Sequence, residues 1–77
     1  MPDTGKKEIL RLLSREWEMT GPPGIMDISD IVSAVSTAPG DTMASLKELF
    51  ASGLIDMNRL KTSAFLTPEG YASVENR

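Results

Sequence analysis

Residues 41–55, DTMASLKELFASGLI, constrain the fold more than any other part of the chain. At about 100° per residue, their apolar positions fall within an arc of roughly 120°, the width of the buried stripe of a surface helix. The predicted stripe consists of Met43, Leu46, Leu49, Phe50 and Gly53. We expect Asp41 to cap the start of this helix and Gly53 to end it in the left-handed conformation. The pattern predicts a helix packed on a small core, with its other face displayed.

The chain has to build that core from apolar side chains alone. Its 77 residues include no cysteine, so disulfides and thiolate metal sites are absent. A chain of this length buries only about 60% of its unfolded surface. It also lacks histidine, the commonest general base, and we find no nucleophile–base pair, phosphate loop or metal set. We therefore expect one domain over residues 1–77, frayed at 1–3 and 76–77, that is not an enzyme and binds no cofactor or metal.

Charge and hydropathy restrict the partners and the location. The net charge is −3, whereas generic nucleic-acid binders are usually basic. No apolar run exceeds three residues, which predicts no membrane span. The N-terminal sequence MPDTGKKEI lacks the apolar core of a signal peptide, so we expect a cytoplasmic protein.

Residues 4–19 are predicted to form the first helix, with Asp3 or Thr4 as its cap. Its apolar arc consists of Ile9, Leu10, Leu12, Leu13 and Trp17. Three cations follow one line on the opposite face, at intervals of four residues: Lys7, Arg11 and Arg15. Glu8 and Glu18 each lie three residues from one of these arginines, so local ion pairs explain the row as a solvated face. A stripe that binds phosphate or a partner is the alternative interpretation.

The next segment alternates short elements with turns. Residues 21–24, Gly-Pro-Pro-Gly, predict a loop, and residues 25–28 are short and apolar enough for an edge strand. Ser29 is expected to cap a second helix over residues 30–36. The tight connection 37–40 then joins this helix to the one that follows, which predicts a helix–turn–helix geometry.

The last third of the chain predicts a hairpin and a final helix. Residues 54–57 and 64–67 read as two strands joined by the loop 58–63. Thr67 is expected to cap the last helix, with Pro68 at the first helical position, where its missing N–H has no cost. The predicted fold is a small α+β domain with the element order α-β-α-α-β-β-α.

Two stretches of this order resemble a known family. Residues 46–55 have the pattern Leu-x-x-Leu-x-x-x-Gly-Leu-Ile, and residues 66–70 read Leu-Thr-Pro-Glu-Gly. Together they resemble the winged helix–turn–helix of MarR-type and PadR-type transcriptional regulators, over about residues 28–74. In those families the first stretch is the recognition helix running into the wing. The second closes the wing and opens the next helix. The resemblance implies a DNA-binding regulator that touches duplex DNA with this helix and the wing.

The chain departs from the family pattern at three points. Val32 and Ser36 stand where the turn commonly has a small residue and a glycine, and Thr42 stands where an apolar residue is usual. The sequence ends at Arg77, without the long terminal helices through which these regulators dimerise. A homodimer or a protein partner is therefore expected to use helix 1 or the C-terminal helix.

The resemblance and the helical wheel together select candidate DNA-binding residues. The set is Thr42, Ser45, Lys47, Asn58, Arg59 and Lys61. Arg59 and Lys61 fit a solubilising role at a hairpin tip equally well. The wheel also places Asp41 and Glu48 on the outward face, where carboxylates oppose phosphates. The alternative function is a winged-helix protein–protein interaction module without DNA binding.

Overall fold

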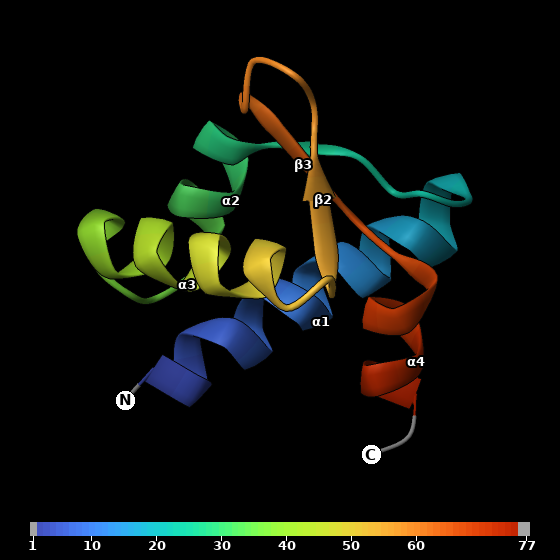
Figure 1. The fold of residues 1–77 in the computed structure, drawn as a ribbon, viewed down its shortest axis with the longest axis horizontal. Coiled ribbons are helices and arrows are strands. Elements are labelled where there is room, and N and C mark those ends of the chain that lie inside the picture. Colours follow the sequence, from blue (N-terminus) through green and yellow to red (C-terminus); the bar gives the residue numbers. More distant parts are fainter. Residues whose placement is uncertain (1, 76–77) are drawn as a thin grey trace.

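The computed structural model describes residues 2–75, with four helices and a three-stranded antiparallel sheet among them (Figure 1). The elements are α1 (Pro2–Thr20), β1 (Met26–Asp27), α2 (Ile28–Ala34), α3 (Pro39–Ala51), β2 (Ile55–Met57), β3 (Ser63–Leu66) and α4 (Pro68–Glu75). This is the predicted order, and the α+β class is confirmed. The loop between β2 and β3 projects beyond the helices.

The sheet has β3 at its centre, in the order β1-β3-β2. Ile55 pairs with Leu66, and Ala64 lies between Met57 on one side and Met26 on the other. Side chains alternate across a strand, so Ala64 and Leu66 of β3 share one face, and both are buried. The predicted edge strand is confirmed at β1.

A single cluster of buried side chains connects α1, α2, α3 and the sheet. Its members are Ile9, Leu13, Ile28, Ile31, Leu46, Leu49, Ile55, Ala64 and Leu66. Trp17 packs at the edge of this cluster and stacks on Tyr71 of α4, with ring centroids 4.6 Å apart and planes inclined by 10°. This stack fastens α4 to α1 near the end of the first helix.

The predicted buried stripe of α3 is wrong in part. Leu46 and Leu49 are buried, but Met43 and Phe50 are each 38% exposed, and Thr42 is fully buried. Thr42 tolerates burial because its hydroxyl lies 2.6 Å from the hydroxyl of the preceding turn's Thr37 and 3.0 Å from a backbone carbonyl. The wheel, which ranks side chains by hydropathy alone, therefore misplaces the helix by part of a turn.

Ser45 is the second polar residue on the buried side of α3. It is 6% exposed and lies against Gly5 of α1, where an added Cβ would approach the Ser45 hydroxyl to 3.0 Å. Two small residues thus let the backbones of α1 and α3 come close. This contact turns Ser45 inward, away from the surface that the sequence assigns to it.

Two of the predicted helix starts are also wrong. α3 begins at Pro39 with Ala38 as its cap, so Asp41 lies within the first turn and does not cap the helix. Proline suits the first helical position because its missing N–H would have no partner there. α2 begins at Ile28, which places Ser29 inside the helix, where the sequence predicted a cap.

The predicted end of α3 and the predicted start of α4 are confirmed. Gly53 has φ = +81°, and the N–H groups of Gly53 and Leu54 donate to carbonyls of the last turn of α3 at 3.1 Å. Thr67 caps α4, because its hydroxyl accepts a 3.0 Å hydrogen bond from the Gly70 N–H. The same Thr67 hydroxyl donates to the Gly53 carbonyl at 2.6 Å, which joins the two helix ends.

The long first helix begins earlier than predicted. α1 starts at Pro2, so residues 2–3 are helical, and neither Asp3 nor Thr4 stands before the helix as its cap. The fraying predicted for residues 1 and 76–77 lies outside the described residues. In the described part of the chain, no helix combines the length and the apolar character that crossing a bilayer requires.

Candidate functional site

The displayed face of α3 is partly apolar and partly charged. Lys47 is exposed between Met43 and Phe50, which lie four residues before it and three after it on the same side of the helix. Glu48 lies on the flank towards α1, and Asp41 is exposed in the first turn of the helix. Glu48 is neutralised there by an ion pair with Lys6 of α1, at 2.6 Å. Lys47 therefore dominates the charge at the centre of this face.

The loop between β2 and β3 is closed by one side chain. The carbonyl oxygen of the Asn58 amide accepts hydrogen bonds from the Thr62 and Ser63 N–H groups at 2.8 and 2.9 Å. Its amide nitrogen donates to the Thr62 hydroxyl at 2.9 Å. Lys61 then takes the left-handed conformation, with φ = +58°. These contacts fix the loop and hold Arg59, Leu60 and Lys61 exposed at its tip.

A cation–π contact joins this loop to α3. The Lys61 ammonium lies over the Phe50 ring, with the nitrogen 4.9 Å from the ring centroid. Phe50 and Lys47 share one side of α3, so the contact brings cations of two elements to the same surface. We call Lys47, Phe50, Arg59 and Lys61 the α3–loop surface.

Three of the six predicted DNA-binding residues reach the surface with their functional groups available. Lys47, Arg59 and Lys61 are exposed. Thr42 and Ser45 are buried, because they pack on the turn before α3 and on α1, and neither side chain is available to a duplex. The Asn58 amide is engaged within the loop. The candidate site therefore shrinks to its three cations.

The helical pattern of the sequence does not predict the apolar part of this surface. Phe50 and Met43 were assigned to the core because their spacing matches that of Leu46 and Leu49. Leu60, at the tip of the loop, is 77% exposed. Thr42 and Ser45 occupy the buried side of the helix instead. Their burial depends on hydrogen bonds to the preceding turn and on the contact with α1, neither of which a helical wheel includes.

No family model, curated protein or solved structure matches this chain. The function must therefore be argued from the chemistry of the displayed side chains. Among the described residues, no three Asp or Glu side chains gather closely enough to hold a metal ion. What the α3–loop surface offers is recognition of a partner through positive charge, one aromatic ring and neighbouring apolar groups.

The outer face of α1 forms a second charged surface, and its ion pairs are not the predicted ones. Glu8 accepts hydrogen bonds from the Ser36 N–H at 2.8 Å and the Ser36 hydroxyl at 2.6 Å, across the gap to the turn after α2. Glu18 accepts a bond from the Tyr71 hydroxyl at 2.9 Å. The predicted ion pairs of these glutamates with Arg11 and Arg15 are not formed among the described residues, because tertiary donors hold both carboxylates, although the charge of Arg11 still acts on Glu8.

The Glu8–Ser36 contact predicts a measurable pH dependence. The two bonds from Ser36, and to a lesser degree the charge of Arg11, lower the pKa of the Glu8 carboxyl below its usual 4.5. Because the folded-state pKa is lowered, the stabilisation is present above the unfolded pKa and is lost as pH falls through the folded pKa. Glu8→Gln should therefore lower the melting temperature near neutral pH, and the difference from wild type should shrink on acidification.

Thermal melts of both proteins between about pH 7 and about pH 3 measure this difference. Ser36→Ala is the matched variant, since it removes the hydroxyl donor and keeps the backbone N–H. Ser36→Ala should therefore lower the melting temperature near neutral pH by less than Glu8→Gln does. A Glu8→Gln difference that stays constant or grows on acidification contradicts the assigned contact.

Proposed function

We propose that this chain is a winged helix–turn–helix domain that binds duplex DNA through α3 and the β2–β3 loop, as a transcriptional regulator. Two short helices joined by a turn, followed by a hairpin next to the second helix, are the arrangement that such a domain uses. The observation that carries the proposal is the Lys61–Phe50 contact, which brings the loop cations beside Lys47 on one surface. This function fits the cytoplasmic location predicted from the sequence.

The charge distribution limits how this surface attracts DNA. The whole chain carries a net charge of −3, so its long-range field does not favour DNA. Attraction has to come from Lys47, Arg59 and Lys61 at short range, while Lys6 neutralises the nearby Glu48. Three phosphate contacts predict a slope of about −3 for the logarithm of affinity against the logarithm of salt concentration.

Fluorescence anisotropy with a labelled duplex tests this proposal. We expect binding to weaken steeply between ~50 and ~200 mM salt. Lys47→Ala and Arg59→Ala should each reduce the slope by about one, because each removes one phosphate contact. Lys7→Ala removes an exposed cation on α1 and serves as the matched control, with the slope expected to stay unchanged.

Two results would contradict the proposed DNA-binding site. No binding to duplex DNA at low salt would remove the regulator proposal. A loss in Lys7→Ala equal to that in Arg59→Ala would show attraction to any cation of the chain, and would contradict a site formed by α3 and the loop.

A protein–protein interaction module is the second candidate, and a specific observation favours it. Met43 and Phe50 are each 38% exposed and Leu60 is 77% exposed, so the same part of the molecule displays large apolar side chains. Contacts of this kind are favourable in protein interfaces. Leu60→Ser should leave DNA binding at low salt nearly intact, because Leu60 contributes no cation to the surface. The same variant should weaken binding to a protein partner if the exposed apolar groups recognise one.

A further inference from the structure

The outer face of α1 carries a row of cations that form no ion pair within the described part of the chain. Three of the chain's eight Lys and Arg residues form this cationic ridge: Lys7, Arg11 and Arg15. All three are exposed, and none of their side chains has an ion pair or hydrogen bond with another described residue. At four-residue intervals they span about 12 Å along one line of the helix. This local concentration of positive charge stands out in a chain with a net charge of −3.

Tertiary contacts keep the nearby glutamates from forming ion pairs with the ridge. The two carboxylates at the right spacing, Glu8 and Glu18, are held by Ser36 and Tyr71. Tyr71 is in turn fixed by its stack on Trp17. The charge of Glu8 still acts on Arg11, but an ion pair with Arg11 would require breaking the Ser36 contacts, so the guanidinium is free to hold an external carboxylate.

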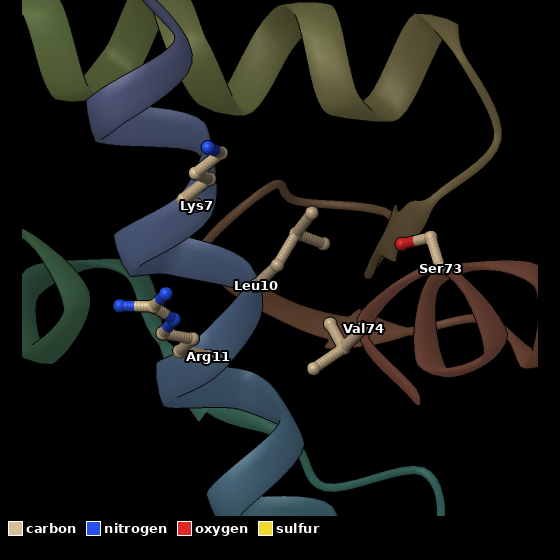
Figure 2. A pocket seen from close by; sticks show the side chains of 5 residues that line it. All are labelled: Lys7, Leu10, Arg11, Ser73 and Val74. Carbon is tan, nitrogen blue, oxygen red and sulfur yellow. The ribbon is translucent and has the colours of Figure 1, made fainter. Parts of the chain in front are cut away.

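Two recesses flank the ridge, one on each side, and each has apolar side chains in part of its wall. One, of about 400 Å³, lies between α1 and α4, with Leu10 and Val74 in its walls. Figure 2 shows these two side chains facing one another across the gap, while Arg11 points to the other side of α1. The second recess, of about 270 Å³, lies between α1 and the end of α2 and is lined in part by Leu12 and Val35. Arg11 borders both recesses.

We propose that the cationic ridge docks an acidic amphipathic segment of a partner protein. Carboxylates spaced by one helical turn would pair with the three cations, and Arg11 can hold a carboxylate through two parallel hydrogen bonds. Apolar side chains on either side of the acidic line would enter the two recesses. Binding an amphipathic helix in this way uses contacts at intervals of three and four residues, which the ridge matches.

The same observations disfavour two other occupants. A second copy in a two-fold dimer presents the same patch to itself, which would bring cation rows together. Nucleic acid would satisfy the ridge with phosphates but would leave Leu10 and Val74 without apolar contacts. Charge and recesses together fit a carboxylate-rich peptide best.

The test uses the full chain and a fluorescein-labelled helical peptide with glutamates along one line and leucines on both flanks. This peptide should bind saturably, and Arg11→Ala should weaken binding about tenfold. Arg11→Glu should abolish binding of this peptide and create affinity for a matched peptide with lysines in place of the glutamates. Arg59→Glu is the control on the distant loop and should bind the glutamate peptide as wild type does. Circular dichroism verifies that each variant is folded.

Four results would overturn the proposal. The first is no saturable binding of the glutamate peptide to wild type. The second is equal binding of a peptide with serines in place of the leucines, which would mean charge attraction alone. The third is a loss of DNA affinity in Arg11→Glu as large as that in Arg59→Ala, which would assign the ridge to nucleic acid. The fourth is a dimer, detected by sedimentation, that Arg11→Glu dissociates. Peptide binding is measured without DNA, so failure of the DNA-binding proposal leaves this test intact.

Discussion

Gly70→Ala is expected to destabilise the domain by about 3 kcal/mol or more, out of the ~4–12 kcal/mol typical of a chain this long. Gly70 is buried in the first turn of α4, where an added Cβ would overlap the backbone carbonyl oxygen of Leu54. It would also come within 2.8 Å of the Leu66 side chain. A carbonyl of the main chain cannot rotate away as a flexible side chain can, so α4 would have to move off the sheet.

Urea titration followed by far-UV circular dichroism measures this loss, with Gly40→Ala as the matched control. Gly40 lies in the first turn of α3, where an added Cβ meets no atom within 4 Å. Alanine there should be neutral or stabilising by up to about 1 kcal/mol, through its higher helix propensity. Two variants of equal stability would contradict the close contact between α4 and Leu54.

Some of the features that fix the ends of α3 and α4 can be predicted from the sequence, and others cannot. Thr67, Pro68 and Gly53 were placed correctly, because caps and left-handed helix ends depend on neighbours within a few residues. The need for glycine at position 70 depends on Leu54, which is distant in sequence and is brought alongside by the hairpin. Caps and helix ends can be predicted from one sequence, whereas contacts between distant segments cannot.

The candidate site divides along the same line. Arg59, Lys61 and Lys47 were expected at the surface and are exposed, because long charged side chains are rarely buried. Thr42 and Ser45 are buried through partners in the preceding turn and in α1, which no helical wheel includes.

The outer face of α1 shows the same limit for charge. Glu8 and Glu18 have the spacing for ion pairs within the helix, but such pairs contribute only about 0.2–0.5 kcal/mol. Ser36 and Tyr71 offer donors that the fold has already positioned, and the two glutamates bind these donors and form no ion pairs within the helix. The unpaired ridge is therefore a property of the tertiary structure.

The second large effect is expected for Leu46→Ala, which should cost ~2–5 kcal/mol. Leu46 is fully buried in the core cluster, so truncation removes apolar contacts and leaves a cavity that helix and sheet cannot readily close. Met43→Ala is the control on the same helix. Met43 is 38% exposed, and its truncation should cost less than about 1 kcal/mol. Fluorescence of Trp17, the single tryptophan, should follow urea unfolding in both variants, because its stack on Tyr71 breaks when α4 separates from α1.

Equal losses of stability in Leu46→Ala and Met43→Ala would support the buried stripe that the helical wheel predicts. Such a result would mean that α3 is rotated about its axis from the orientation described. That rotation would also return Ser45 to the surface and bury Phe50, which would remove the Lys61–Phe50 contact on which the proposed DNA-binding surface depends.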